Sequence, residues 1–438
     1  MSQKSSTSRR TFLKHSAVAA GTLAALQAST VRQVHASAEG PMKIALIGCG
    51  GRGTGAVSDC LEAAKILQQP MKLVAVADVF ENRARGSLKA LKDKWQGAID
   101  VSDDQVFVGL DAYKKAIDCG ADLLLMATPP GFRPLHYAAA VEAGKNIFME
   151  KPLCTDAPGY RKIMAASEQA DKKGLKVVVG LQRHHQGPYL QGIQEIHDGK
   201  LGDIQFLRVY WNGSGGGARD IGPRPQNDPK EMEFQIANWG CFRWLYGDNI
   251  VEQHVHNIDI GNWVMSKGGD PKAAHPVEAV GIGGRGNRGN YGDIFDHHYI
   301  EFTYADGTKM FSQSRHQPGT WDQVDEFAHG TKESRRVANG DGPKLESGNP
   351  YVQEHVDLMK AIAGDKYLNE AWLSAASSMT AVLGRMASYS GDVVTWDDAV
   401  ANGANEAPDT IAWDAKPKSL PDEKGNYPFP LPGITEAF

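Results

Sequence analysis

A short glycine-rich segment near the start of the chain has the composition of a phosphate-binding loop. Residues 48–53 read GCGGRG, directly after an apolar run and before a stretch with helical character. In the pattern GxGxxG, the first glycine permits a tight turn, the second lets the backbone approach a pyrophosphate, and the third allows close packing of helix on strand. Because a helix N-terminus attracts phosphate, this context predicts a dinucleotide site. Its expected contacts are Gly48, Gly50, Gly51, Arg52 and Gly53.

Residues at the ends of two further expected strands complete this site. Asp78 ends a second apolar run, where a carboxylate accepts hydrogen bonds from both hydroxyls of an adenosine ribose and repels a 2′-phosphate. The sequence therefore favours NAD over NADP as cofactor, although Arg83 stands close enough to reach a phosphate. Thr128 and Pro129 follow a third apolar run, at the edge where doubly wound sheets bind ligands.

Lys151 is a candidate proton acceptor. It follows a fourth apolar run, between Glu150 and Pro152, so it is expected at the same sheet edge beside the nicotinamide ring, with Glu150 as a further cofactor contact. Alcohol oxidation must remove a hydroxyl proton while a hydride leaves the carbon. A lysine with the ordinary pKa of about 10.4 is a poor base at neutral pH. Burial near a cationic ring would lower that pKa.

A second group of titratable residues lies in the segment EQHVHNID, residues 252–259. The segment is expected to begin a helix, on which Glu252 and His256 share a face because they are four residues apart. Asp259 falls three residues further, near the same face. We expect His256 to act as general acid or base with Lys151, and Asp259 to orient the imidazole or bind a substrate hydroxyl.

Several polar and aromatic residues flank these groups and suit a sugar or polyol, whose hydroxyls need hydrogen-bond partners and whose faces stack on rings. The expected substrate contacts are Arg183, His184, His185, Trp239 and Arg243. A metal site is not expected, because His254 and His256 would point about 200° apart on a helix. Five cysteines without CxxC spacing also predict neither a zinc ribbon nor a disulfide framework.

The motifs GCGGRG, ATPP, FMEKPL and EQHVHNID together resemble the Gfo/Idh/MocA oxidoreductases, the family of glucose–fructose oxidoreductase and inositol dehydrogenase. The resemblance extends from Met42 to Val400. It implies a Rossmann domain followed by an open-faced antiparallel sheet that carries the substrate and often an oligomer interface. It also implies that Lys151 contacts the reacting hydroxyl, and that Glu252 stands where the family usually has an aspartate. Some relatives are NAD-dependent glycosidases, so the resemblance leaves the reaction open.

The expected helices and strands predict two domains followed by a C-terminal tail. Strands alternate with helices over 42–182, which predicts a parallel sheet. Over 183–400, alternating strands are expected at 204–211, 277–281, 298–304 and 309–314, the last two joined by a turn at Asp306-Gly307. The second half is therefore predicted to be α+β with a mainly antiparallel sheet, with helices at 351–363 and 371–389. The Pro-rich tail, 401–438, is expected to form an arm over a neighbouring subunit.

The N-terminus has the features of an export signal. Residues 8–14 read SRRTFLK, a twin-arginine pattern, followed by a short apolar run and the cleavage motif Ala36-Ser37-Ala38. We therefore expect a signal peptide at 1–38, a periplasmic mature protein and no transmembrane helix. The formal net charge of −5 and the absence of a basic stripe argue against nucleic-acid binding.

These features predict an enzyme that oxidises or reduces a secondary hydroxyl of a sugar or cyclitol with NAD, as a homo-oligomer formed through the C-terminal sheet. Two alternatives stay open. One is redox-neutral chemistry, glycoside cleavage or epimerisation through a transient keto-sugar, with His184, His185 or Tyr189 as the second base. The other is a non-catalytic NAD sensor, which retention of Lys151 and His256 disfavours.

Overall fold

The N-terminal domain contains a sheet of six parallel strands in the order β3-β2-β1-β4-β5-β6. The computed structural model describes residues 40–213, 219–286 and 289–438, so the expected signal peptide lies outside the described residues. Since the strand order reverses beside β1, the carboxyl ends of β1 and β4 open onto a crevice. The strands are β1 (Met42–Ile47), β2 (Met71–Asp78), β3 (Val106–Val108), β4 (Leu123–Met126), β5 (Asn146–Met149) and β6 (Val177–Val179).

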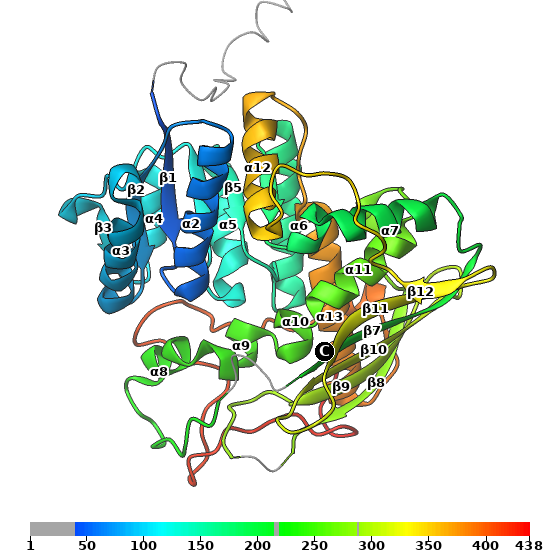
Figure 1. Ribbon diagram of the computed structural model, residues 1–438. Helices are drawn as coiled ribbons and strands as arrows, with labels where there is room; N and C mark the ends of the chain where they lie inside the picture. Colours follow the sequence, from blue (N-terminus) through cyan, green and yellow to red (C-terminus); the bar gives the residue numbers. More distant parts are fainter. Residues whose placement is uncertain (1–39, 214–218, 287–288) are drawn as a thin grey trace, which may run out of the picture.

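Helices cover both faces of this sheet (Figure 1). Alternate residues of β1 point to opposite sides: Ile44 and Leu46 face one layer, and Ala45 and Ile47 face the other. The first layer consists of α2 (Gly51–Ile66), α3 (Glu81–Trp95) and α12 (Pro350–Ala363). The second consists of α4 (Ala112–Asp118), α5 (Arg133–Glu142) and α6 (Ala157–Lys172). The first domain is thus completed by a helix from the far end of the chain, α12.

The second domain is built on a seven-stranded sheet in the order β12-β11-β7-β10-β9-β8-β13. Its inner face packs on α11 (Val255–Ser266) and α13 (Ala371–Ser390), whereas Ile282 and Tyr299 are exposed on the outer face. The strands are β7 (Ile204–Gly213), β8 (Glu278–Gly284), β9 (His297–Thr303), β10 (Lys309–His316), β11 (Gln323–Gly330), β12 (Ser334–Arg336) and β13 (Val394–Thr395).

The second sheet is mainly antiparallel, as predicted, with one parallel pair of strands. β7 and β10 are parallel, and the other neighbours are antiparallel. A parallel pair needs a long crossover, and the chain between these strands supplies one that includes several helices. The helices there include α8 (Glu231–Ala237), α9 (Arg243–Tyr246) and α10 (Asn249–Glu252). The turn at Asp306-Gly307 is confirmed, with Gly307 at φ +84°.

The single helix expected to start at Glu252 is also wrong. α10 ends at Glu252, and α11 begins at Val255. The intervening His254 is fully buried, and its Nε2 lies 2.8 Å from Ser312 Oγ on β10. Because the buried imidazole needs a polar partner, the chain turns inward here instead of continuing one helix.

The C-terminal segment packs against its own chain. α14 (Trp396–Asn402) runs past the expected boundary at residue 400, and the segment 403–438 then passes beside α8 and α9 (Figure 1). Tyr427 is buried there against Phe242, with ring centroids 4.9 Å apart. In this structure the segment therefore forms an arm over its own subunit, and the arm over a neighbouring subunit stays a prediction.

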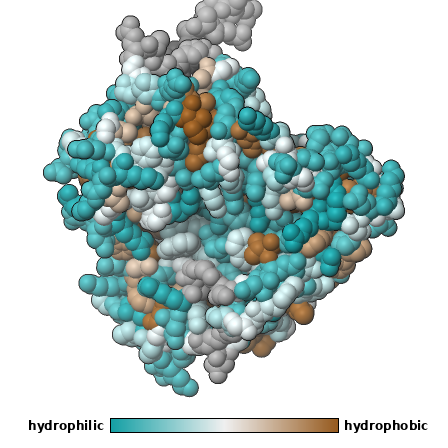
Figure 2. All heavy atoms as spheres, in the orientation of Figure 1, coloured by the Kyte–Doolittle hydropathy of each residue, from teal (hydrophilic) through white to brown (hydrophobic). Residues whose placement is uncertain are grey.

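In the described ranges no helix is long and apolar enough to span a bilayer. The face of the molecule in Figure 2 is mostly hydrophilic, and its apolar residues form separate patches.

The contact between the glycine-rich loop and α2 generates a stability prediction. A Cβ on Gly53 would lie 1.9 Å from the carbonyl oxygen of Gly48, whereas one on Gly55 would meet Arg52 Nη1 at 3.5 Å. We expect Gly53→Ala to lower the free energy of unfolding by about 1–3 kcal/mol through overpacking. Gly55→Ala, two residues along the same helix, should be neutral or raise the free energy of unfolding by about 1 kcal/mol. Equal denaturant midpoints for the two variants would contradict this account of the loop.

Candidate active site

A cavity of about 850 Å³ lies between the carboxyl ends of the parallel strands and the second domain. It brings together side chains from segments that are far apart in the sequence. The first domain contributes the loop at 48–53, Asp78, Thr128, Pro129, Glu150, Lys151 and, from α12, Tyr351; the second contributes Trp211, Trp239, Glu252 and His256. The expected cofactor loop and the expected proton-transfer residues therefore face one space.

The glycine-rich loop fits a pyrophosphate. α2 begins at Gly51, and its N-cap, Gly50, provides no side chain to satisfy the first N–H groups. Cβ atoms placed on Gly50 or Gly51 would meet no neighbour within 4 Å, so side chains there would project into open space beside the cavity. The bare N–H groups and the positive end of the helix dipole together form an anion site.

Asp78 is fixed in position to accept ribose hydroxyls. Its Oδ2 accepts a hydrogen bond of 2.8 Å from the Cys49 N–H, and its Oδ1 accepts one of 2.9 Å from the Phe80 N–H. Each carboxylate oxygen can accept a second hydrogen bond. The carboxylate therefore anchors the loop and keeps acceptor capacity on the cavity wall.

Lys151 is paired across the cavity with Glu252. Its Nζ donates to Glu252 Oε1 at 2.9 Å and also to the backbone oxygen of Glu252. Both side chains are nearly buried, and Gln253 Nε2 donates to the other carboxylate oxygen at 2.6 Å. The glutamate side chain thus reaches the lysine directly. The pair joins the end of β5 to the end of α10.

His256 lies in the same cavity with its ring stacked on Trp211, the centroids 5.7 Å apart. Burial lowers the pKa of His256 well below its ordinary value, and the positive charges of Lys151 and Arg183 lower it further. Its Nδ1 has no hydrogen-bond partner among the described residues. The imidazole is therefore neutral at physiological pH and able to accept a proton.

Asp259 does not orient His256, contrary to expectation. Its Oδ2 lies 2.5 Å from His184 Nε2, and its Oδ1 accepts from Ser377 at 2.8 Å. His184 in turn stacks on Trp263, with centroids 4.1 Å apart. Asp259 thus lies outside the cavity lining, where it fixes a neighbouring imidazole against α11.

Most of the expected substrate contacts are also held by other partners. Arg183 pairs with Glu326 at 2.5 Å, and Arg243 pairs with Glu406 at 2.8 Å. His185 lies between Asp357 and Glu370; burial alone would lower its pKa, but these carboxylates raise it to about 10. Buried charges require such partners, and the partners come from distant parts of the chain. Of the expected contacts Arg183, His184, His185, Trp239 and Arg243, the described cavity lining includes Trp239.

Arg52 connects the glycine-rich loop to Glu150 instead of pointing only at a phosphate. Its Nε donates to Glu150 Oε1, Nη1 donates to Asp59 at 3.2 Å, and Nη2 lies 3.6 Å from Glu354 on α12. Burial raises the pKa of Glu354 well above its ordinary value. One guanidinium therefore ties together the loop, the segment that carries Lys151 and a helix from the C-terminal half.

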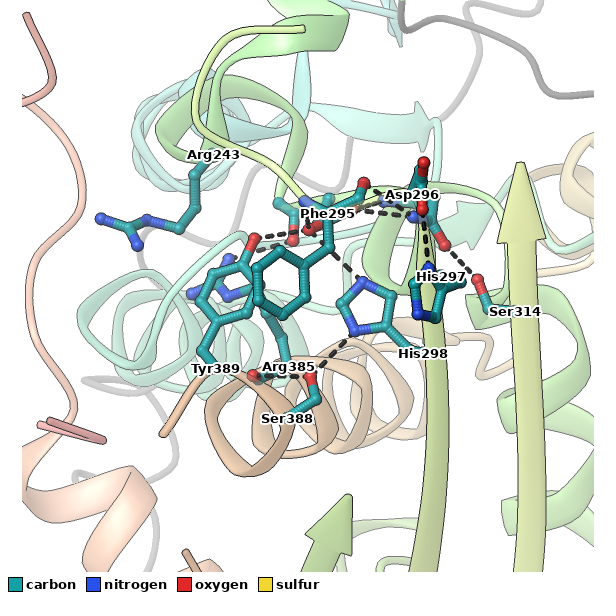
Figure 3. A network of polar contacts seen from close by, with 12 residues as sticks. Arg243, Phe295, Asp296, His297, His298, Ser314, Arg385, Ser388 and Tyr389 are labelled. Atoms are coloured by element: carbon teal, nitrogen blue, oxygen red, sulfur yellow. Dashed lines mark hydrogen bonds and ion pairs between the residues drawn. The ribbon is translucent and has the colours of Figure 1, made fainter. Parts of the chain in front are cut away.

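A buried polar network surrounds the N-terminus of α10 (Figure 3). Asp248, the N-cap of α10, has φ +85° and a fully buried carboxylate that accepts from Phe295 N–H at 2.8 Å and from the Tyr389 hydroxyl. His298 approaches it at 3.4 Å and also contacts Ser388 at 2.8 Å. The guanidinium of Arg243 lies 5.7 Å from the centre of the Tyr389 ring (Figure 3). The network fixes the start of the helix whose last residue is Glu252.

Trp211, Gln182, Gln253 and Tyr351 line the cavity but were not expected to. Trp211 lies in the alternating segment 204–211, which was predicted to be a strand. That alternation could have indicated that Trp211 lies on one face of the sheet together with other residues of the site. Tyr351 lies on α12, and no local pattern connects that helix with the glycine-rich loop. In the described part of the chain, no three His, Cys, Asp or Glu side chains gather as metal ligands.

Residues 42–181 match the family model described as oxidoreductase family, NAD-binding Rossmann fold, of the Gfo/Idh/MocA group. This part of the chain is similar to the NAD-binding Rossmann domains of that family, and the glycine-rich loop and Asp78 fit the cofactor. Scyllo-inositol 2-dehydrogenase (NAD(+)) of Bacillus subtilis is 27% identical over 205 residues, 45% of this chain and 53% of that protein. Inositol 2-dehydrogenase of Klebsiella pneumoniae is 26% identical over 48% of this chain and 55% of its own length. The chain thus spans about half the length of the curated relatives it matches.

Solved structures share the fold of both domains. The structure of scyllo-inositol dehydrogenase from Lactobacillus casei with bound NAD(H) and scyllo-inositol has a TM-score of 0.60 at 19% identity, over 82% of this chain and all of that one. The aldose-aldose oxidoreductase of Caulobacter crescentus complexed with glycerol has a TM-score of 0.58 at 16% identity, covering 81% of this chain and all of its own. At these identities the likeness establishes the two-domain architecture.

The neutral state of His256 predicts how stability depends on pH. In the unfolded chain a histidine titrates near pH 6.5, whereas the folded protein holds His256 neutral. As the pH falls below about 6.5, the unfolded chain binds the extra proton, and this site lowers the free energy of unfolding by about 1.4 kcal/mol per pH unit. His256→Phe keeps a ring against Trp211 and removes the titration. Its unfolding free energy should fall less steeply between about pH 6.5 and 5; parallel curves would show that His256 is protonated when folded.

Proposed function

We propose that this protein is an NAD-dependent oxidoreductase that acts on a secondary hydroxyl of a sugar, glycoside or cyclitol. The main support for this proposal is that Lys151 and His256 line the same cavity as the glycine-rich loop and Asp78. The inositol dehydrogenases among its relatives and structural neighbours support a polyol substrate. A neutral substrate is also favoured because Arg183 and Arg243 form ion pairs with Glu326 and Glu406. Neither guanidinium is therefore free to bind a negatively charged group of a substrate.

The chain's own residues supply binding and proton transfer. Bound NAD provides the hydride acceptor. Lys151 donates a hydrogen bond to the reacting oxygen while Glu252 holds its ammonium in place. The neutral His256 takes the hydroxyl proton as the carbonyl forms, which leaves an imidazolium. Trp211 keeps the ring of His256 oriented and, with Trp239, gives the sugar an apolar surface.

The redox-neutral route is the second candidate, and its expected second bases are all engaged elsewhere. His184 contacts Asp259, His185 contacts Asp357 and Glu370, and Tyr189 donates to Glu326 at 2.9 Å. An elimination would therefore have to use Lys151, Glu252 or His256 a second time. Incubation with a panel of free sugars and glycosides distinguishes the two routes: a lasting nicotinamide absorbance change indicates net dehydrogenation, and release of aglycone without it indicates the redox-neutral route.

Substitution of the proton-transfer residues tests the first proposal. Lys151→Ala and His256→Ala should each lower kcat at least about 100-fold, the usual contribution of a positioned acid or base, while NAD still binds, as followed by fluorescence titration. Lys145→Ala changes a lysine at the opposite end of β5 and should keep wild-type kcat. Substantial residual activity in either cavity variant would remove that residue from the proton pathway.

We further propose that the protein is exported through the twin-arginine pathway with NAD already bound. The motif at 8–14 supports this, because that route carries folded proteins and a released cofactor would not be reoxidised outside the cytoplasm. Catalysis there requires a cofactor that stays bound and is reset in the same site, by a second substrate or by the first one after rearrangement.

Retention of the cofactor is directly measurable. The purified protein should carry about one NAD(H) per chain through gel filtration and turn over a substrate, or a substrate pair, without added cofactor. A protein that elutes without nucleotide and releases NADH in proportion to added NAD would contradict this.

Gel filtration also reports the mass of the particle. We propose that the protein is an oligomer formed through the outer sheet face around Ile282 and Tyr299. A monomer mass would contradict the use of that surface.

A further inference from the structure

One wall of the cofactor cavity belongs to neither sheet. Ile236 on α8 and Trp239 just after it line the cavity opposite Val79 and Arg83, which follow Asp78 at the end of β2. The Nη2 of Arg83 donates to the backbone oxygen of Ala237 at 3.4 Å. α8 therefore closes the side of the cavity on which Asp78 would hold the ribose.

α8 is short, and the C-terminal segment holds it in place. The Tyr427 hydroxyl donates to Glu231 at 2.5 Å, and Gln235 Nε2 donates to the backbone oxygen of Ser419 at 2.8 Å. Tyr427 is buried in an apolar cluster with Met232, Ile236 and Phe242. Since a helix of two turns is not stable alone, these contacts decide where the cavity wall stands.

The same segment also touches the rim of the Rossmann domain. The ring of Trp413 lies 6.3 Å from that of Phe80, and the guanidinium of Arg83 lies 4.9 Å above the Phe80 ring. The Phe80 N–H is bound to Asp78. A continuous series of contacts thus runs from Trp413 through Phe80 and Arg83 to α8, across the ribose side of the cavity.

Charged contacts fix the beginning of the segment. Glu406 pairs with Arg243 at 2.8 Å and with the fully buried Arg385 at 3.3 Å, and its N–H donates to Asp156 at 3.0 Å. Further along, the backbone oxygen of Gly425 accepts from Asn290 at 2.9 Å. The segment is thus attached at Glu406 and at Gly425, and between these points it packs against α8.

We propose that the C-terminal segment 403–438 and α8 together form a cofactor cover, a binding element that slows the release of NAD. The inference rests on the proposed retained-cofactor function and adds the residues responsible for it. It also assigns Arg83 a role: its guanidinium is engaged by Phe80 and Ala237, so it reinforces the cover instead of offering a charge to a 2′-phosphate.

The test is the exchange of bound NAD for isotopically labelled NAD, followed by mass spectrometry of the extracted nucleotide. Trp413→Ala removes one ring contact from a side chain that is 41% exposed, so the fold should persist. The loss of an aromatic contact predicts exchange about three- to tenfold faster. Tyr427→Phe, which keeps the packing and removes the bond to Glu231, should also accelerate exchange. Trp321→Ala makes the same change as Trp413→Ala on an exposed residue outside the cavity lining, and should exchange at the wild-type rate.

Backbone hydrogen exchange provides a second readout. Stripped protein reloaded with NAD should gain protection in 231–246 and in 403–427 as well as in the glycine-rich loop. Unchanged NAD exchange in both Trp413→Ala and Tyr427→Phe, or protection confined to the Rossmann domain, would overturn the cover even if the enzyme turns over sugars. Faster exchange in these variants would support the cover even if no sugar is oxidised, because it is measured without turnover.

Discussion

The ion pair between Lys151 and Glu252 joins the two domains at the centre of the cavity. One partner ends a strand of the parallel sheet, and the other ends a helix held by the second domain. A nearly buried ammonium needs a carboxylate and a carbonyl around it, and Glu252 supplies both from a single residue. The geometry of this pair therefore constrains both the segment after β5 and the end of α10.

Each side of the pair has its own support. Next to Lys151, Glu150 is held by Arg52, so the glycine-rich loop and Lys151 share one set of contacts. Behind Glu252, the buried carboxylate of Asp248 gathers donors from the loop before β9 and from α13. Cofactor loop and catalytic pair are thereby positioned by the same packed framework, as a site that must hold sub-ångström geometry requires.

The pairing of charges around the cavity also bears on what it can bind. The cationic side chains near it are matched by carboxylates or backbone oxygens, with Arg133 donating to the carbonyls of Thr128 and Pro152. What remains is a set of hydrogen-bonding groups, a neutral imidazole and two tryptophans, Trp211 and Trp239. Such a lining offers hydrogen-bond partners and flat apolar faces, which agrees with the proposed sugar or polyol substrate.

The sequence by itself determined the parts whose physics is local. The loop at 48–53, the carboxylate of Asp78 and the placement of Lys151 after a buried strand follow from strand–turn–helix patterns within a few residues, and the parallel sheet follows from their repetition. The tertiary structure decided which charges meet. It paired Asp259 with His184 and Arg243 with Glu406, interrupted the helix after Glu252, and made β7 and β10 parallel. It also brought Tyr351 to the cofactor cavity and the C-terminal segment to α8. These outcomes depend on contacts between residues tens to hundreds of positions apart. A buried charge must be paired, and the fold determines which opposite charge lies close enough to pair with it.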